Sequence, residues 1–335
     1  MNEQITLAHG SGGSMMHELI KAVFKKHLSN NILDRGDDAA ELIMSGKRLA
    51  FTTDSFVVSP IFFKGGNIGK LAVCGTVNDL CTSGAKPLYL SCGFILEEGF
   101  PVKQLEEIVA SMAQTAAECG VKIVTGDTKV VPKGAADKIF INTSGIGEIP
   151  EHINISGSNA KPGDSVIISG PVGDHGCTIL LERENLGINT SLQSDCAPLY
   201  SMAESLLQAV PDVHVLRDPT RGGLATTLNE ISQQSKTGIC LVESQIPVRD
   251  ELRGVCELLG MDPLYMACEG RLIVIVPKAS EQAALTALRG SKYGSGACVI
   301  GEVTSEYPGK TYMKTLAGGS RILDMLVGDQ LPRIC

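Results

Sequence analysis

The last residue of the sequence, Cys335, carries a thiol with no further chain beyond it. It follows Pro332-Arg333-Ile334, and behind that lie a short apolar stretch and the pair Gly318-Gly319. From Gly319 to Cys335 the chain spans roughly 50 Å when extended, at about 3.3 Å per residue. A thiolate attacks well and later leaves well, so a tethered sulfur of this kind is typical of a group carrier. A frayed terminus that ends in cysteine is the structural alternative.

Five aspartates of the first half stand at the ends of predicted elements or in glycine-flanked turns: Asp37, Asp38, Asp54, Asp79 and Asp127. Magnesium prefers a few carboxylates together with waters and phosphate oxygens, so this pattern predicts a metal–nucleotide site. Lys129 follows Asp127 at a predicted strand end and supplies a cation for phosphate. A single aspartate of this kind is more often a cap or turn residue, which makes the prediction depend on the set.

A glycine-rich turn, His9-Gly10-Ser11-Gly12-Gly13, precedes a predicted helix that begins near Met16. Such a turn offers free backbone N–H groups to an anion, so we expect Gly10, Ser11, Gly12 and Gly13 to contact phosphate. A flexible loop that leads into the helix is the alternative. The spacing does not fit the dinucleotide-binding fingerprint, and the segment 65–71, which resembles a P-loop, is one residue short.

A second phosphate or oxyanion site is predicted where Asp218-Pro219-Thr220-Arg221-Gly222-Gly223 opens a helix. A plain helix cap by Asp218 or Thr220 is the alternative, but a cap requires neither Arg221 nor the paired glycines. Glu269 precedes an apolar strand, where it lies in a surface turn or acts as a base near this site. His175, in a glycine-rich turn at 169–176, is expected to be a structural hydrogen-bonding residue.

Composition excludes several classes of protein. A formal net charge of -8 with no basic cluster among aromatics argues against nucleic-acid binding. No apolar run approaches the ~18 residues of a membrane span, and the N-terminus does not resemble a signal peptide, so we expect a cytoplasmic protein. The 11 cysteines are scattered without a Cys-x-x-Cys pair, which indicates neither a zinc ribbon nor a disulfide framework.

Alternating strand and helix patterns across 335 residues predict an α/β (α+β) protein of two domains. In the first half, helices are expected at 67–83 and 104–119, between strands at 49–58, 87–96, 121–124 and 139–142. A shift to Asn, Ser, Gly and Pro at 149–162 marks the boundary. The predicted domains are 1–152, which binds nucleotide, and 153–317, followed by a flexible tail at 318–335.

The motifs resemble those of the aminoimidazole-ribonucleotide synthetase (PurM-like) superfamily, which also contains selenophosphate synthetase and thiamine-monophosphate kinase. The marks are Gly36-Asp37-Asp38-Ala39, Thr53-Asp54-Ser55, Asn78-Asp79-Leu80, Gly126-Asp127-Thr128-Lys129 and Asp218 to Gly223. Within it, the glycine-rich turn at 9–13, the segment 134–138 and the ending Pro332 to Cys335 are most similar to a family of [NiFe] hydrogenase maturation factors. No cysteine precedes Cys74, so the N-terminal loop lacks the reactive residue of selenophosphate synthetase.

This resemblance implies a homodimer formed through the first halves, with ATP near the subunit interface. It implies that Cys335 receives a carbamoyl group from HypF, that ATP drives its dehydration to a thiocyanate, and that the cyano group passes to iron on the HypC–HypD pair. It assigns nucleotide contacts to the marks above, among them Asn78 and Gly126. With this reaction, Asp37, Asp54, Asp79 and Asp127 are the expected Mg²⁺ ligands and Cys335 is the expected carrier. Lys129 is expected to stabilise charge on the transferred phosphoryl group. The carbamoyl nitrogen must also lose two protons to a base, for which Glu269 and Lys129 are the candidates.

Two other functions fit parts of the sequence. One is a superfamily kinase or synthetase that acts on a free small molecule and has no need of Cys335. The other is a nucleotide-binding scaffold without catalysis, which uses the tail only to dock partners.

Overall fold

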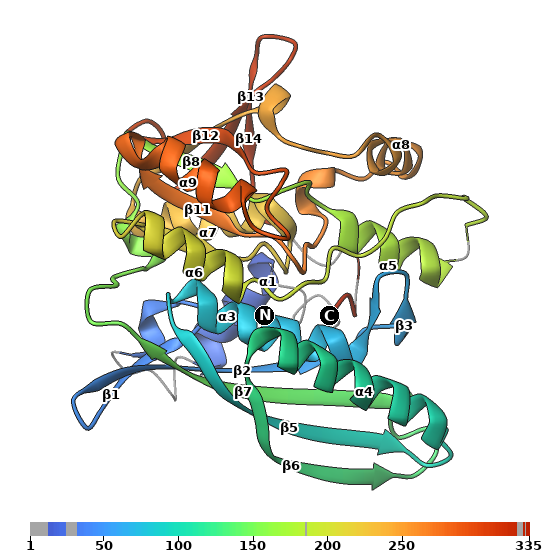
Figure 1. Ribbon diagram of the computed structural model, residues 1–335. Coiled ribbons are helices and arrows are strands. Elements are labelled where there is room, and N and C mark those ends of the chain that lie inside the picture. The colour runs from blue at the N-terminus through green and yellow to red at the C-terminus, as the bar shows by residue number, and fades with distance from the viewer. Residues whose placement is uncertain (1–12, 25–31, 185, 327–330, 332) are drawn as a thin grey trace.

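The computed structural model describes residues 13–24, 32–184, 186–326, 331 and 333–335. Two β-sheets, each with its own helices, lie one above the other, which confirms the predicted mixed α/β fold (Figure 1). The described C-terminal residues lie between the two layers, close to α5 and β3 (Figure 1). The first element among the described residues is α1 (Ser14–Leu19), which continues as a π-helical turn (Ile20–Phe24).

The first sheet has five strands in the order β1-β2-β7-β5-β6. They are β1 (Ala40–Met44), β2 (Lys47–Phe56), β5 (Lys86–Glu97), β6 (Lys122–Val131) and β7 (Ile139–Ile149). All neighbours are antiparallel except β5 and β6, which need the crossover helix α4 (Val102–Cys119) between them. Helices α3 (Ile68–Thr82) and α4 cover one face of this sheet, and the short strands β3 (Phe62–Phe63) and β4 (Gly66–Asn67) lead into α3 (Figure 1).

Alternation along β2 decides which side chains face the helices. Thr52 and Phe56 are buried on the side of α3, whereas Phe51 and Ser55 are exposed on the other side. Asp54 shares the covered side, and its carboxylate lies next to Gly75 of α3. The open side of the sheet therefore carries a different set of side chains from the side that holds Asp54.

The second sheet has seven strands in the order β14-β13-β10-β12-β8-β11-β9. They are β8 (Asp164–Ile168), β9 (Val215–Arg217), β10 (Gly238–Val242), β11 (Ile273–Pro277), β12 (Cys298–Thr304), β13 (Thr311–Lys314) and β14 (Ser320–Leu323). Its helices are α5 (Asp174–Glu184), α6 (Tyr200–Ala209), α7 (Gly223–Ser235), α8 (Asp250–Leu259) and α9 (Glu281–Arg289).

The two faces of the second sheet enter different cores. Val166 and Ile168 of β8 pack with Leu224 and Leu228 of α7. Ile167, between them, belongs to a larger core that also contains α6, α9 and the buried side of the first sheet. The two layers therefore share one continuous apolar core, which fixes the residues between them.

Within the segment 318–335, which the sequence suggests is a flexible tail, residues 320–323 form β14 and pair with β13. β1 and β14 have weak signals in the sequence because they are only five and four residues long. Ile5-Thr6-Leu7, which the sequence predicts to be a short strand before the glycine-rich turn, lies outside the described residues. No helix among the described residues is long and apolar enough to cross a membrane.

Candidate active site

The last three residues dock between the sheets rather than projecting into solvent. The Val57 N–H donates to the main-chain oxygen of Cys335 at 2.9 Å, and the Ser59 N–H donates to that of Arg333 at 3.3 Å. This register is that of a short antiparallel pair, which extends from the end of β2. Ile334 and Cys335 pack against the shared core. The sulfur is thus placed by backbone hydrogen bonds and by burial together.

The thiol of Cys335 lies among charged side chains from both layers. Arg221, at the start of α7, makes an ion pair with Asp54 of β2, with 2.9 Å between Nη2 and Oδ1. Burial raises the pKa of Cys335 to about 12, although Arg221 beside it favours the thiolate and so lowers the pKa; Glu269 and Asp54 raise it. The docked sulfur is therefore a neutral thiol, which is a poor nucleophile.

Glu269 is buried near this thiol, and its side chain is 2% exposed. Burial raises its pKa well above the usual value, and Cys196 and Asp218 raise it further. Its Oε1 has no hydrogen-bond partner within the described part of the chain. A buried carboxyl with a free oxygen and increased basicity is suited to taking a proton from a neutral group placed beside it.

Asn78 joins the two layers directly. Its Nδ2 donates to the carbonyl oxygen of Ala197 at 3.1 Å, and its Oδ1 accepts from the Leu199 N–H at 2.9 Å. A weaker contact runs from Nδ2 to the carbonyl oxygen of Glu269 at 3.5 Å. The sequence predicts that Asn78 contacts nucleotide; in the structure its amide instead holds the backbone around Glu269.

Four carboxylates crowd the junction between α3, β2 and the loop before α7: Asp38, Asp54, Asp79 and Asp218. Burial, then Asp218 and Asp54, raise the pKa of Asp79 well above its usual value. Burial and then Asp38 raise the pKa of Asp218 to about 7. Asp38 is held by Arg217, with 2.6 Å between Oδ2 and Nε. The cluster therefore combines four carboxyl groups with two arginines, Arg217 beside Asp38 and Arg221 beside Asp54.

A magnesium–nucleotide fits this cluster. Asp79 and Asp218 provide hard oxygen donors. Burial and then the neighbouring carboxylates raise their pKa values, and a bound divalent cation would favour their deprotonated, ligating forms. Within the described residues no three or more His, Cys, Asp or Glu side chains form a closed metal cage. Mg²⁺ does not require one when phosphate oxygens and water complete its shell.

Asp37, a predicted magnesium ligand, has other partners. Its Oδ1 accepts from the Ser156 hydroxyl at 2.9 Å and from the Gly157 N–H at 3.4 Å, while Arg35 contacts its Oδ2 at 3.2 Å. These contacts attach the first sheet to the linker that follows β7. In this structure Asp37 therefore lies outside the group formed by Asp54, Asp79 and Asp218.

Asp127 and Lys129 lie on the open side of the first sheet. The strand register puts Asp127 in one row with Gly93, Asn142 and Ser55, whose side of the sheet faces away from α3. The side chains of Asp127 and Lys129 are each 70% exposed, and they form an ion pair with 2.8 Å between Oδ2 and Nζ. They border a cavity of about 440 Å³ that also includes Val57, the residue bonded to Cys335. A single chain does not bring them together with Asp54 and Asp79.

The predicted glycine sites have steric roles where the structure describes them. Gly222 and Gly223 have positive φ values of 68° and 61°, and a Cβ on Gly223 would collide with the carbonyl oxygen of Met266. A Cβ on Gly126 would collide with the carbonyl oxygen of Cys92 on β5. Thr220 is partly buried in the loop before α7.

At the N-terminus, Gly13 packs against Leu326, and the Ser14 N–H donates to its carbonyl oxygen at 2.7 Å. Gly10, Ser11 and Gly12 lie outside the described residues. The predicted phosphate contact of this turn therefore stays a prediction.

Sequence reasoning missed several residues that hold the tail. Arg183 of α5 donates to the carbonyl oxygen of Arg333 at 2.7 Å. The Arg333 guanidinium contacts Asp137 at 2.6 Å and lies over the ring of Phe140 at 5.9 Å. The only signal for Asp137 is its place in the motif at 134–138, and nothing local to Arg183 distinguishes it from a surface arginine.

Comparison with known proteins identifies the relatives of this chain. The AIR synthase related protein family matches with its N-terminal domain at residues 36–149 and its C-terminal domain at 161–314. The carbamoyl dehydratase HypE of Rhodobacter capsulatus is 51% identical over 338 residues, which cover 100% of this chain and 99% of the relative.

Two solved structures are similar over most of their length. A HypE–HypF complex superposes with a TM-score of 0.88 at 49% identity, covering 92% of this chain and 99% of the other. HypE in complex with ATP superposes with a TM-score of 0.84 at 53% identity, covering 99% and 100%. The chain therefore belongs to the AIR synthase related proteins and, within them, to the HypE family of hydrogenase maturation proteins.

Proposed function

We propose that the protein dehydrates a carbamoyl group carried on Cys335 to a thiocyanate, at the expense of ATP, and passes the cyano group to iron during [NiFe] hydrogenase maturation. The observation that carries this proposal is the placement of the terminal sulfur, which docks beside Arg221, Asp54 and Glu269 at the junction of the two layers. Relatives named carbamoyl dehydratase HypE and the ATP-bound HypE structure support it.

The raised pKa of Cys335 separates two stages of the cycle. A docked thiol is protonated and unreactive, so carbamoylation by HypF requires the tail to leave the site. An S-carbamoyl group is neutral, as is a thiocyanate, and neither incurs the cost of burying a charge. The loaded tail, in which Cys335 carries the carbamoyl group, is thus better suited to docking than the unloaded tail with a Cys335 thiolate. A HypE–HypF complex supports HypF as the donor, and HypC–HypD is the proposed acceptor.

The chemistry needs an activated oxygen and a base. Attack of the carbamoyl oxygen on the γ-phosphate of ATP forms the O–P bond and releases ADP, while one proton leaves nitrogen. Loss of the second proton then expels phosphate and forms the C≡N bond, leaving R–S–C≡N. Glu269 takes a nitrogen proton, and Arg221 and Lys129 stabilise charge on the phosphoryl group. Magnesium held by Asp79 and Asp218 would neutralise phosphate charge.

The open side of the first sheet supports a homodimer. Phe51, Ile146 and Tyr89 form one cross-strand row there and are 41%, 41% and 49% exposed. Ile95 of β5 pairs with Lys129 of β6 on the same side and is 43% exposed, so apolar residues recur along this side of the sheet. A contiguous exposed apolar face of this kind is typical of an interface, and a second copy pairs it with itself. We further infer a cytoplasmic location.

Such a dimer would bring Asp127 and Lys129 of one subunit toward the carboxylates of the other. We expect dimers that combine a Lys129→Ala subunit with an Asp79→Asn subunit, purified through two different tags, to regain about half of the wild-type dehydration rate, because one of two shared sites is intact. Each variant alone should be inactive. If each active site were formed by one subunit alone, both sites of the mixed dimer would carry a substitution. The mixed dimer would then be as inactive as the two single variants.

Intact-mass analysis tests the reaction itself. The protein is first carbamoylated by HypF, purified away from HypF and nucleotide, and then given ATP and Mg²⁺. We expect the carbamoyl adduct to lose the mass of one water only when ATP is present. An adduct on another cysteine, or an adduct that ATP leaves unchanged, would reject the proposal.

A further inference from the structure

His175 lies between the docked tail and the loop 194–197. Its Nε2 is 2.8 Å from the carbonyl oxygen of Ile334, the residue before the reactive cysteine. Its Nδ1 is 2.7 Å from the hydroxyl of Ser194, which also accepts from the Cys196 N–H at 3.1 Å. The ring is buried and packs edge-on against Phe63 with 5.5 Å between centroids.

These partners determine the tautomer of the imidazole. A carbonyl oxygen can only accept, so Nε2 must carry the hydrogen that it donates to Ile334. The Ser194 hydroxyl then donates to the unprotonated Nδ1, while its oxygen accepts from Cys196. Burial lowers the pKa of His175, which keeps the ring neutral as this arrangement requires.

The same loop holds Glu269 on its other side. The Glu269 N–H donates to Asp195 Oδ1 at 3.1 Å, and the Ala197 N–H donates to the carbonyl oxygen of Glu269 at 3.3 Å. The residues that contact the tail and the residues that hold the base are therefore neighbours in one short segment.

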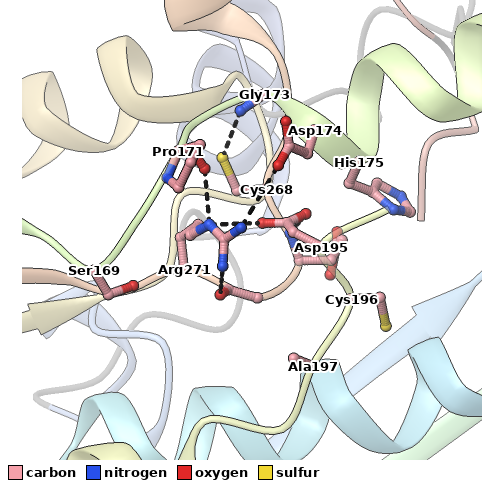
Figure 2. Close-up of polar contacts among 12 residues, drawn as sticks. Ser169, Pro171, Gly173, Asp174, His175, Asp195, Cys196, Ala197, Cys268 and Arg271 are labelled. Carbon is pink, nitrogen blue, oxygen red and sulfur yellow. Dashed lines mark hydrogen bonds and ion pairs between the residues drawn. The ribbon is translucent and has the colours of Figure 1, made fainter. Parts of the chain in front are cut away.

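Arg271 fixes this segment through its guanidinium, which lies beside Asp195 (Figure 2). Its Nε donates to the carbonyl oxygen of Pro171 at 2.7 Å, and its Nη1 donates to that of Gly270 at 3.1 Å. It also forms ion pairs with Asp174 at 3.6 Å and with Asp195 at 3.5 Å (Figure 2). The start of α5, the loop 194–197 and the residue after Glu269 thus share one guanidinium.

We propose that His175 is a positioning residue that holds the loaded tail through Ile334 and, through Ser194 and its loop, sets the sulfur of Cys335 in register with Glu269. This inference rests on the proposed dehydration, for which it names the group that aligns carrier and base. His175 itself transfers no proton to the substrate.

Two variants separate positioning from folding. In His175→Gln, the side-chain amide lies near the position of Nε2 and still donates to the carbonyl oxygen of Ile334. In His175→Asn, the shorter side chain places its amide near the position of Nδ1, so the bond to Ile334 is lost. Ser194→Ala removes the donor that fixes the tautomer and gives an independent route to the same defect. The control is His214→Asn, because His214 makes a bond of the same length, 2.7 Å, to Asp164 on the second sheet.

Tail docking is measured on the unloaded protein by the rate at which iodoacetamide alkylates Cys335. Cleavage after Glu306 releases residues 307–335, in which Cys335 is the only cysteine. The docked thiol is unreactive, so the rate reports the undocked fraction. Dehydration is measured separately on protein already carbamoylated by HypF, by loss of water after addition of ATP.

We expect His175→Asn and Ser194→Ala to alkylate about tenfold faster and to dehydrate about tenfold more slowly than wild type. Carbamoylation by HypF should be at least as fast as in wild type, because it uses the undocked tail. His175→Gln and His214→Asn should stay within about twofold of wild type in both assays. Equal behaviour of the Asn and Gln variants, or wild-type alkylation in Ser194→Ala, would overturn the assignment. Wild-type protein that fails to dehydrate would instead reject the proposed function and leave the alkylation result standing.

Discussion

Replacement of Cys335 by alanine should abolish formation of the thiocyanate altogether. In the proposed reaction the sulfur is the covalent carrier of the carbamoyl group, and no other side chain occupies its place beside Arg221 and Glu269 in the part of the chain that the structure describes. Intact-mass analysis after incubation with HypF and carbamoyl phosphate should show no adduct. ATP binding should persist, because the proposed nucleotide contacts lie in the carboxylate cluster and not in the tail.

Cys298 provides the matched control for this variant. Nine cysteines are buried, and Cys298 is the other partly exposed one besides Cys335. Cys298→Ala should therefore carbamoylate and dehydrate at the wild-type rate. Product formation by Cys335→Ala would favour an enzyme that acts on a free small molecule. ATP binding without ATP hydrolysis, even by the carbamoylated wild-type protein, would favour a scaffold.

Glu269→Gln should slow dehydration by about 10²–10⁴-fold while leaving carbamoylation intact. The substitution keeps the shape of the side chain and the backbone bond to Asp195, but an amide cannot accept the nitrogen proton. The carbamoyl adduct should accumulate in the presence of ATP and be visible by mass. Glu257→Gln, an exposed position on α8, is the control and should leave the rate unchanged.

The pH profile gives this prediction a second readout. Burial raises the pKa of Glu269 well above that of an ordinary carboxyl group. A base acts only when deprotonated, so the wild-type rate should increase with pH until the pH passes that raised pKa. The Gln variant should lose this increase. A variant with the same pH profile and a rate near wild type would exclude Glu269 as the base.

The regular elements of the protein follow from local sequence patterns. Helix α5 (Asp174–Glu184) follows a glycine-rich turn, and its first turn carries an acid, which is a sequence pattern typical of a helix start. Asn67 stands one residue before the apolar helix α3 in the sequence. Its side chain caps this helix by accepting from the N–H groups of Gly69 and Lys70. The α/β class is predictable on the same grounds.

The site is less predictable because it is assembled from distant segments. Asp54 and Asp127 both come from strands of the first sheet, yet the register sends their side chains to opposite faces. The sequence alone does not fix that register, so it groups them as one set of ligands. His175 and Arg271 act through long-range contacts with the tail and the loop 194–197, and a single sequence gives no local sign of such partners.

The fate of the carbamoyl oxygen tests the central claim most directly. The carbamoyl group on Cys335 is labelled with a heavy isotope of oxygen, the loaded protein is purified, and ATP is added in ordinary water. Phosphorylation of that oxygen predicts that the label appears in the released inorganic phosphate, one atom for each thiocyanate formed. Label found in water, with unlabelled phosphate, would contradict the account.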